Sequence, residues 1–372
     1  VVVGILFPLV FGNFNLWFGR ALIFLVISCP CALVISVPLT FFSSIGTASK
    51  QGILIKGGNY LETLTNIGAV VFDKTGTLTK GKFKIDSIEA INCDEKELLK
   101  TAQIGELYSN HPIGKAILSQ LNEEIDEDYI EGYKELSGFG VVAYYEGKEI
   151  LVGNYKLMEE YSIAAQEKEY AGTVIYTAQD GDFLGYIYIS DEIKEDSFST
   201  IENLKNLGVD SYMLTGDSKT IGEMVGNKLG IPLKNIFTHL LPQNKVEKLQ
   251  EIMNTSNKKV VFVGDGINDA PVLSLADIGI AMGGTGSDIA VESADVVIMK
   301  DEPSKIVELL KIAKLNKKVV IQNIVFALGI KILVMILGVF GIANMWMAIF
   351  SDVGVSLLAV INASWGIKRG YN

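Results

Sequence analysis

Residues Val70–Gly81 read VVFDKTGTLTKG, and this stretch decides how the rest of the chain is interpreted. The apolar run Ala69–Phe72 predicts a short buried β-strand that ends at Asp73 and turns through Thr and Gly. The carboxyl ends of parallel strands form the edge of an open α/β sheet at which ligands bind. A carboxylate at that edge can attack phosphorus as a nucleophile. We therefore predict that Asp73 accepts a phosphoryl group, and prefer this to an ordinary polar turn.

Charged residues are distributed very unevenly along the chain. They make up 20% of the 372 residues, yet they are nearly absent from Val1–Thr47 and Val319–Ile367. This pattern predicts a membrane–soluble–membrane arrangement. The net charge of -11 belongs to the soluble middle and argues against nucleic acid as a partner. Three cysteines are too few for a disulfide framework.

The first hydrophobic part contains one segment long enough to cross a bilayer, which takes about 20 residues. That segment is Ala21–Gly46. Val1–Phe11 is apolar but too short and reads as the end of a helix, and Gly12–Gly19 is predicted as a loop.

A Cys-Pro-Cys sequence lies within the predicted spanning helix. Pro30 has no N–H and clashes with the preceding turn, so the helix is expected to break there. Non-helical backbone at this depth is tolerated where it is buried or lines a cavity. Two flanking thiolates are soft ligands that suit Cu(I), Zn(II), Cd(II) or Pb(II). We predict that Cys29 and Cys31 bind a metal ion; the alternative is two small buried cysteines.

Two more spanning segments, Val319–Ala343 and Trp346–Ile367, are predicted near the C-terminal end with an uncharged turn near Asn344 between them. Basic residues flank the hydrophobic segments on one side, which places that side in the cytoplasm by the positive-inside rule. These residues are Lys50, Lys56, Lys311, Lys314, Lys317, Lys318, Lys368 and Arg369. We therefore expect an integral protein of the plasma (inner) membrane with cytoplasmic catalytic domains.

Lys331 and Asp352 interrupt this hydrophobic hairpin. A charge near the bilayer centre costs roughly 2.5–3.5 kcal/mol on insertion scales, so each is treated as functional. At about 1.5 Å per residue, Cys31, Asp352 and Lys331 lie roughly 22, 20 and 18 Å from their cytoplasmic ends. They are therefore expected to meet in one layer, with Lys331 as counter-ion. The alternatives are a helix-pairing or solvated Asp352 and a Lys331 that extends to the interface.

The middle region alternates short β-branched runs with amphipathic helices, which is typical of an α/β sheet. Further polar residues stand where strands end, in MLTGD (213–217) and VVFVGDGIND (260–269), and a lysine opens a helix between them. Mg²⁺ binds few carboxylates together with phosphate oxygens, which suits the second of these strand ends. The residues concerned are Thr215, Gly216, Asp217, Lys245, Asp265 and Asp269.

DKTGTLT, TGD, GDGIND and the intervening lysine together resemble the phosphorylation-domain motifs of the P-type ATPases. The resemblance implies α-helical transmembrane segments plus an α/β cytoplasmic region. That region would comprise a haloacid-dehalogenase-like Rossmannoid phosphorylation domain with an inserted α+β nucleotide-binding domain. ATP and Mg²⁺ are the implied cofactors. The implied catalytic residues are Asp73, Lys74, Thr75, Thr215, Gly216, Asp217, Lys245, Asn268 and Asp269. The implied Mg²⁺ ligands are Asp73, the carbonyl group of Thr75, and Asp265.

The stretch from about Lys82 to Ser190 resembles the nucleotide-binding domain of the heavy-metal branch of that family. ELYSNHP, ELSGFG and a later Gly-Asn pair occur in the order of its three motifs. Glycine permits close approach of the backbone to a ligand, and a histidine can stack on a base. The residues implied for the adenine pocket are Glu106, His111, Pro112, Glu135, Gly138, Gly140, Gly153 and Asn154. The D-x-x-K sequence at Asp191–Lys194 departs from the usual D-x-x-R hinge of the family.

The Cys-Pro-Cys motif restricts the resemblance to the heavy-metal (type IB) pumps. The Lys331 and Asp352 segments resemble the zinc/cadmium/lead group, and the Asn/Tyr and Met/Ser arrangement of the copper group is not found. A carboxylate beside two thiolates also suits a borderline divalent ion better than Cu⁺. The resemblance thus implies ATP-driven export of Zn²⁺, Cd²⁺ or Pb²⁺ through an aspartyl-phosphate on Asp73, with a Cu⁺ exporter as the alternative.

Four parts of the chain are predicted from these assignments. They are a transmembrane part at 1–59, a phosphorylation domain at 60–81 and 191–303, a nucleotide-binding domain at 82–190, and two C-terminal transmembrane helices at 304–372.

The sequence holds no Thr-Gly-Glu, the signature of the family's actuator domain. We therefore expect a C-terminal fragment that lacks the actuator domain and the upstream helices, and that turns over poorly alone. Two rival hypotheses remain. A soluble phosphatase of the same fold would carry an acid/base Asp where Thr75 stands. A metal-binding membrane protein without catalysis would take up no phosphate at Asp73.

Overall fold

The structure is a computed structural model that describes residues 14–109, 111–120, 125–170, 172–265, 269–283 and 292–371. The chain forms two compact units. The first unit contains the hydrophobic helices together with the strands that adjoin them in sequence, and the second contains Val70–Glu251 and a short segment that begins at Val263.

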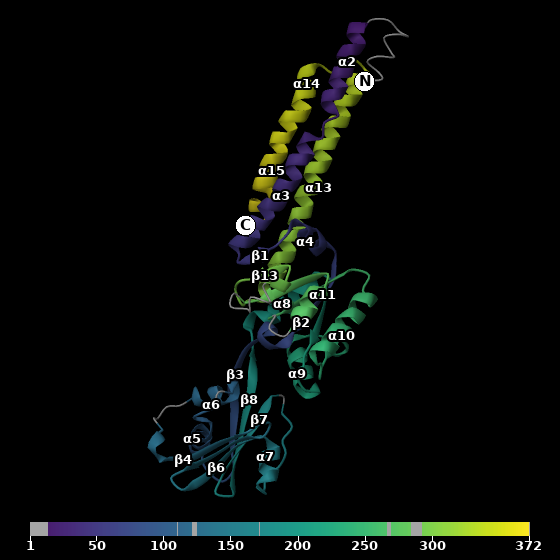
Figure 1. Ribbon diagram of the computed structural model, residues 1–372. Helices are drawn as coiled ribbons and strands as arrows, with labels where there is room; N and C mark the ends of the chain where they lie inside the picture. Colours follow the sequence, from purple (N-terminus) through teal and green to yellow (C-terminus); the bar gives the residue numbers. More distant parts are fainter. Residues whose placement is uncertain are drawn as a thin grey trace. The chain divides into compact units, whose positions relative to one another are not determined.

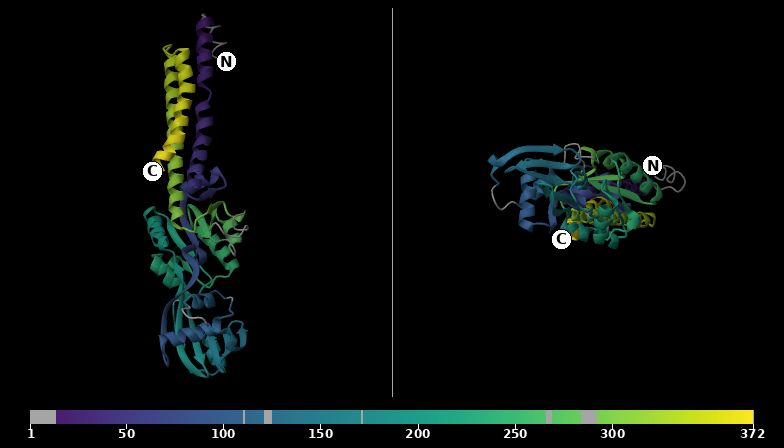
Figure 2. Two further views of the ribbon diagram at one scale, coloured as in Figure 1. Left: turned by 90° about the vertical axis from the view of Figure 1, so that its left-hand side faces the viewer. Right: turned by 90° about the horizontal axis from the view of Figure 1, so that it is seen from below.

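The hydrophobic helices of the first unit pack side by side, as Figures 1 and 2 both show. Within the described residues, three helical stretches are long and apolar enough to cross a membrane, which confirms the three predicted spans. These stretches are Trp17–Lys50, Ser304–Val339 and Met345–Ile367. The elements involved are α2 (Phe14–Ile27), α3 (Cys31–Lys50), α13 (Ser304–Val339), α14 (Met345–Ile349), a π-helical turn (Phe350–Gly354) and α15 (Val355–Tyr371).

The predicted break at Pro30 is confirmed, because α2 ends at Ile27 and α3 begins at Cys31. The predicted loop at Gly12–Gly19 is wrong for its described part, since residues from Phe14 onward are helical. The intervening Asn15 and Gly19 have low helix propensity, but tertiary packing overrides such weak preferences. Val1–Phe11 lies outside the described residues.

Short elements connect the helices of this unit to a sheet. They are β1 (Ile53–Ile55), α4 (Gly58–Thr63), a 3₁₀ turn (Leu64–Asn66), α11 (Ala270–Leu275), β12 (Ile278–Met282) and β13 (Val296–Ile298). Strand β13 pairs in parallel with β12 and antiparallel with β1. All residues of β12 and β13 are buried, as expected for parallel strands that are covered on both faces.

Seven strands form one hydrogen-bonded sheet in the order β1-β13-β12-β11-β2-β9-β10. The strands not yet named are β2 (Ile67–Asp73), β9 (Asp210–Leu214), β10 (Ile236–Phe237) and β11 (Lys259–Gly264). The helical elements that alternate with these strands along the chain are α8 (Glu195–Asn206), α9 (Lys219–Leu229), a 3₁₀ turn (Leu233–Asn235) and α10 (Pro242–Thr255). This alternation confirms the predicted α/β class for the region.

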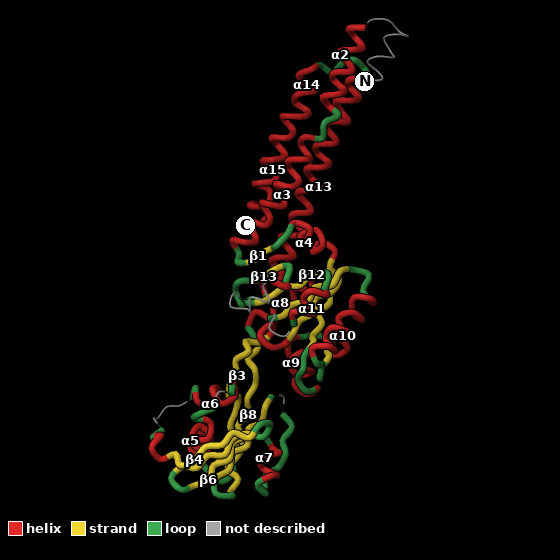
Figure 3. The backbone as a smooth tube through the Cα atoms, in the orientation of Figure 1, coloured by secondary structure: helices red, strands yellow, loops and turns green. Residues whose placement is uncertain are grey.

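The second unit also contains a six-stranded antiparallel sheet in the order β3-β8-β7-β6-β5-β4. Figure 3 shows this sheet with α5 and α6 on one side and α7 on the other. Its strands are β3 (Thr79–Ala90), β4 (Ile130–Leu136), β5 (Gly140–Tyr145), β6 (Lys148–Gly153), β7 (Thr173–Gln179) and β8 (Asp182–Ile193). Its helices are α5 (Glu95–Glu106), α6 (Pro112–Leu118), a 3₁₀ turn (Glu127–Tyr129) and α7 (Tyr155–Glu160). The predicted domain boundaries at 82 and 190 fall inside β3 and β8, which pair with one another.

Each face of this sheet carries its own hydrophobic core, and successive side chains of β6 enter the two cores in turn. Ile150 and Val152 pack with α5 and α6, whereas Leu151 packs with Leu157 and Met158 of α7. Successive residues of a strand point to opposite faces, so one strand contributes to both cores.

We predict that Leu151→Ala destabilises this unit by about 2–5 kcal/mol, because Leu151 is 1% exposed and the substitution leaves a cavity. The exposed Lys148 on the same strand is the control, and Lys148→Ala is expected to change stability by less than about 0.5 kcal/mol. Urea unfolding checks both values. Equal effects of the two substitutions would contradict the assignment of Leu151 to the core.

Candidate functional site

The sheet edge predicted from DKTGT is built as a strand followed by a tight turn. Strand β2 ends at Asp73, and the turn Lys74–Leu78 leads into β3. Gly76 has φ +73°, a conformation that favours glycine. A methyl group added at Gly76 would lie 3.1 Å from Oδ2 of Asp265, so the Asp265 carboxylate lies against the turn. The structure thus brings Asp265 next to the Asp73 turn, as the sequence predicted.

Asp73 and Lys245 form a buried ion pair. The Nζ atom of Lys245 lies 2.6 Å from Oδ1 of Asp73, and the two residues are 9% and 7% exposed. Lys245 reaches this position from the first turn of α10. An ammonium group held here can neutralise negative charge that arrives at Asp73, which favours an anionic substrate such as a phosphate ester.

Lys74 points to a different set of carboxylates. Its Nζ atom lies 2.5 Å from Oδ2 of Asp217 and 3.9 Å from Oδ2 of Asp191. The Thr215 hydroxyl donates to Asp217 at 3.0 Å, and the Thr79 hydroxyl donates to Asp191 at 2.5 Å. The Asp73 turn, the TGD segment and the end of β8 are therefore connected through polar side chains, of which Lys74 is buried and Asp217 is half-buried.

Burial raises the pKa of Asp191, and the hydrogen bond from Thr79 and the charge of Lys74 act in the opposite direction. This carboxyl group belongs to the D-x-x-K sequence, whose first three residues end β8 and whose Lys194 follows it. The Lys194 side chain at the end of that sequence is buried and donates to the carbonyl oxygens of Gly76 at 2.8 Å and Thr77 at 2.9 Å. Lys194 therefore holds the backbone of the Asp73 turn. Sequence reasoning singled out Lys194 only as a departure from a hinge motif, and missed this contact.

A cavity of about 770 Å³ lies over the six-stranded sheet. All but one of the residues predicted for an adenine pocket line it, namely Glu106, His111, Glu135, Gly138, Gly140, Gly153 and Asn154. The remaining one, Pro112, is the first residue of α6. Three segments that are far apart in sequence therefore meet at one cavity, as their order predicted.

Position 140 in the lining of this cavity requires glycine, because its backbone lies very close to the backbone of Val152. A methyl group on Gly140, which has φ +143°, would lie 2.2 Å from the carbonyl oxygen of Val152. Asn154 fixes the rim, since its side-chain amide donates to the carbonyl oxygen of Gly138 at 2.7 Å and its Oδ1 caps α7. His111 uses Nδ1 to accept a hydrogen bond from the backbone N–H of Ile113.

Glu106 is the buried titratable group of the cavity. Burial raises its pKa, and the negative charge of Glu135 raises it further, while a hydrogen bond from Ser109 lowers it. A second cavity, of about 410 Å³, is lined by Lys74, Thr75, Asp191 and Asp217 and shares Thr173 with the first. The two cavities therefore adjoin at Thr173, and the second reaches the turn that follows Asp73.

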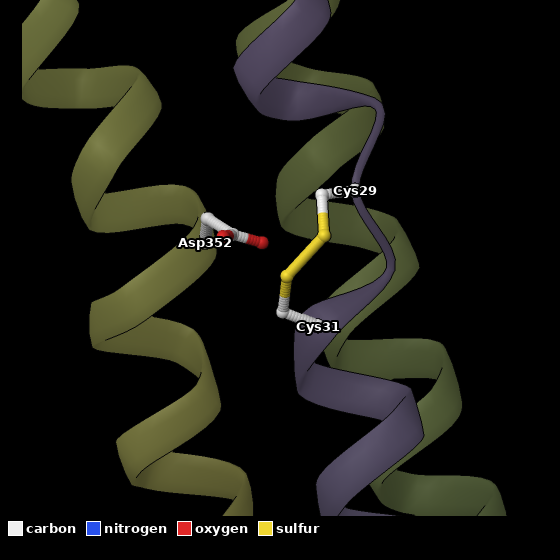
Figure 4. A group of neighbouring side chains, drawn as sticks. All are labelled: Cys29, Cys31 and Asp352. Atoms are coloured by element: carbon white, nitrogen blue, oxygen red, sulfur yellow. A yellow bond between two sulfur atoms is a disulfide. The ribbon is translucent and has the colours of Figure 1, made fainter.

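The membrane part brings Cys29, Cys31 and Asp352 together, as Figure 4 shows. Their ligand atoms all lie within 4.8 Å of one another. Lys331 joins the group, with its Nζ atom 2.9 Å from Oδ1 of Asp352. The predicted convergence of these residues in one layer is therefore confirmed.

Lys331 also completes the hydrogen bonding of the broken helix. Its ammonium group donates to the carbonyl oxygens of Ile27, at 3.1 Å, and of Cys29. The break at Pro30 withdraws these carbonyls from the helical ladder, and a cation at a helix C-terminus also interacts favourably with the helix dipole.

The two sulfur atoms are joined as a disulfide in this structure, which the sequence did not predict. Only Pro30 lies between the two cysteines, and their Cα atoms are 5.5 Å apart, within the range for a disulfide. Thiolates rather than disulfide sulfurs bind metal ions. The donor set of two sulfurs and a carboxylate fits a divalent ion only when the cysteines are reduced.

Four predicted catalytic residues make none of the contacts described above. Asn268 lies outside the described residues. Asp269 is buried at the start of α11. Thr75 and Gly216 are exposed.

Known proteins resemble this chain in sequence and in structure. The sequence model of a family described as haloacid dehalogenase-like hydrolase matches residues 67–277. A cadmium, zinc and cobalt-transporting ATPase of Bacillus subtilis (strain 168) is 53% identical over 96% of this chain and 51% of its own length. A zinc-transporting ATPase of Synechocystis sp. is 48% identical over 94% of this chain and 48% of its own length.

Among solved structures, a zinc-transporting PIB-type ATPase in the E2.Pi state matches with a TM-score of 0.85 and 33% identity. The match covers 98% of this chain and 61% of that one. The chain belongs to the haloacid dehalogenase-like hydrolase family, and its resemblance to the heavy-metal P-type ATPases is confirmed. It spans about half the length of the curated relatives it matches.

We predict that Glu106→Gln stabilises the protein at neutral pH. The native pKa of Glu106 is raised above its ordinary value of 4.5, so the native state loses stability as pH rises from 4.5 through the raised pKa. The neutral amide avoids this loss. Urea unfolding at pH 4.5 and pH 7.5 should show a gain in stability that is present only at the higher pH. A difference that does not change with pH would contradict the assignment.

We also predict that Lys194→Met lowers stability by about 1–3 kcal/mol, because the carbonyl oxygens of Gly76 and Thr77 lose a buried donor. Lys194→Arg keeps a cationic donor and should retain most of the stability. Thermal unfolding of both variants provides the measurement. Equal losses would mean that packing, rather than the hydrogen bonds, makes Lys194 important.

Proposed function

We propose that this chain carries out the phosphorylated half of an ATP-driven exporter of divalent heavy-metal cations, with Asp73 as the phosphorylated residue. The observation that carries the proposal is the pair of sites described above. One is a carboxylate nucleophile with a lysine partner, and the other is a group of two cysteines and a carboxylate within the membrane helices. Relatives named as zinc-, cadmium- and cobalt-transporting ATPases support it.

The proposed reaction transfers the γ-phosphoryl group of ATP to Asp73. A carboxylate oxygen of Asp73 forms a bond to phosphorus, the bond to the bridging oxygen breaks, and ADP leaves. Lys245, 2.6 Å from Asp73, is suited to hold the transferred phosphoryl oxygens. Lys74, held by Asp217, keeps the turn after Asp73 in place.

We assign Asp73, the carbonyl oxygen of Thr75 and Asp265 as the residues that would hold Mg²⁺. Their hard oxygen atoms fit this ion, and the carboxylate of Asp265 lies against the turn. When bound, the ion neutralises phosphate charge. The cavity around Glu106 and Gly140 is the proposed adenine pocket, and the adjoining cavity at Lys74 leads from it toward Asp73.

We place the transported ion between Cys29, Cys31 and Asp352, with Lys331 as an internal counter-ion. A set of two thiolates and a carboxylate favours Zn²⁺ or Cd²⁺ over Cu⁺. Lys331 now pairs with Asp352, so a divalent cation and Lys331 compete for the same carboxylate. This competition provides a way to release the ion.

The catalytic domains are proposed to face the cytoplasm, because basic residues flank the spans on that side. Hydrolysis of the phosphorylated Asp73 is assigned to an actuator domain and further helices of the same polypeptide. Complete transport is therefore a property proposed for the whole protein.

Phosphorylation tests the proposal directly. The complete, reduced polypeptide is reconstituted in lipid and incubated with γ-³²P-ATP and Mg²⁺, with Zn²⁺, Cd²⁺ or Cu⁺ added. We expect acid-stable ³²P on the protein that depends on Zn²⁺ or Cd²⁺. Stimulation by Cu⁺ alone would contradict the divalent assignment.

Two variants separate the sites. Asp73→Asn should reduce ³²P incorporation to background, because the amide is a poor nucleophile. Asp352→Ala should abolish the dependence on Zn²⁺ while leaving nucleotide binding intact. Unchanged stimulation by Zn²⁺ in Asp352→Ala would count against the membrane site.

A further inference from the structure

A second polar contact joins α13 and α15 in the membrane part, apart from the Lys331–Asp352 pair. Asn362 donates from Nδ2 to Oδ1 of Asn323 at 2.8 Å. Asn323 in turn donates from its own Nδ2 to the carbonyl oxygen of Ala359 at 3.2 Å. Eight residues separate Asn323 from Lys331, which is about 12 Å along the helix.

The geometry of Asn323 restricts how the two helices can move. The side chain is 2% exposed and uses both ends of its amide on α15, as acceptor from Asn362 and as donor to Ala359. Because the amide is planar, these two bonds together fix both the rotation of α15 and its position along α13. A buried asparagine between helices is a known means of fixing register.

The Lys331–Asp352 pair needs such a constraint. The Lys331 ammonium group donates to α2, to the broken segment and to Asp352 at the same time. A slip of one residue along α15 moves its atoms by about 1.5 Å and rotates them by about 100°, enough to break a hydrogen bond of 2.9 Å.

The backbone at Asp352 differs from the α-helices on either side of it. Asp352 lies in a π-helical turn, Phe350–Gly354, whose hydrogen bonds span one residue more than those of an α-helix. Single π-helical turns are rare in proteins as a whole but are common at functional sites. Regular helix resumes at Val355, and the contact with Asn323 is made further along, at Ala359 and Asn362.

We propose that Asn323 and Asn362 are positioning residues that hold α15 in register with α13, and so set the metal affinity of the site formed by Cys29, Cys31 and Asp352. The inference rests on the proposed function for its metal readout. Neither asparagine contacts the three ligand residues in any hydrogen bond described here, so they act through Lys331 and Asp352.

The chain offers a matched control. Asn316 is also a buried asparagine of α13, but its Oδ1 accepts from the Ser44 hydroxyl of α3 at 2.9 Å. Asn316→Ala therefore removes an interhelical hydrogen bond of the same kind without loosening the contact between α13 and α15.

The test uses the complete, reduced polypeptide in lipid nanodiscs. The free Zn²⁺ concentration at half-maximal phosphorylation from ATP is measured for wild type, Asn362→Ala and Asn316→Ala. Loss of an interhelical hydrogen bond predicts an increase of about 3- to 20-fold for Asn362→Ala, with the maximal level and nucleotide affinity kept. Asn316→Ala should shift it by less than about twofold. An unchanged value for Asn362→Ala, or an equal shift for Asn316→Ala, would overturn the proposal.

A metal-free measurement separates this proposal from the proposed function. Thermal unfolding of Asn362→Ala, Asp352→Asn and the double variant forms a double-mutant cycle. We expect the two effects to be non-additive, because the asparagines hold Asp352 in place. Additive effects would contradict the proposal even if Zn²⁺ stimulates phosphorylation. If wild type shows no metal dependence, the proposed function fails and this cycle alone decides the positioning role. Should Asn362→Ala fail to fold, Asn362→Leu, which keeps the side-chain volume and removes the donor, replaces it in both measurements.

Discussion

The arrangement of the membrane helices depends on a missing hydrogen-bond donor. Pro30 has no N–H, so the helix that enters the membrane at α2 stops at Ile27 and restarts at Cys31. Carbonyl groups freed at this depth need new partners, since lipid offers none. Lys331 provides one for Ile27 and Cys29, and its charge then needs the carboxylate of Asp352. The break thus brings a lysine, a carboxylate and two cysteines to one place.

In the second unit, backbone carbonyl groups in the turn that follows β2 also need hydrogen-bond donors. The turn after Asp73 is five residues long and joins β2 to β3. Two buried lysine side chains hold this turn in place. Lys74 reaches the TGD segment, while Lys194 holds the carbonyl oxygens of Gly76 and Thr77 from the end of β8. Strand β8 lines the cavity beside Lys74, and its neighbour β7 contributes Thr173 to both cavities, so the six-stranded sheet links the two.

Much of this arrangement could be predicted from local sequence. The partner of Asp73, the residues around the cavity of about 770 Å³ and the meeting of Cys31, Lys331 and Asp352 all follow from motifs, strand ends and helix rise. The contacts of Lys194 and Asn323 could not be predicted, because each depends on a backbone carbonyl of a distant segment. The helix from Phe14 was missed for a related reason, since packing against neighbours overrides a loop-like composition.

The proposed site for a divalent heavy metal is formed by the broken helix and Asp352. Zinc K-edge X-ray absorption on the complete, reduced polypeptide would show its ligands. We expect two sulfur ligands at about 2.3 Å and one or two oxygen ligands at about 2.0–2.2 Å for each bound Zn²⁺. The sulfur shell should disappear in a variant with Cys29→Ser and Cys31→Ser. A zinc shell made only of oxygen and nitrogen in the wild-type protein would contradict the account.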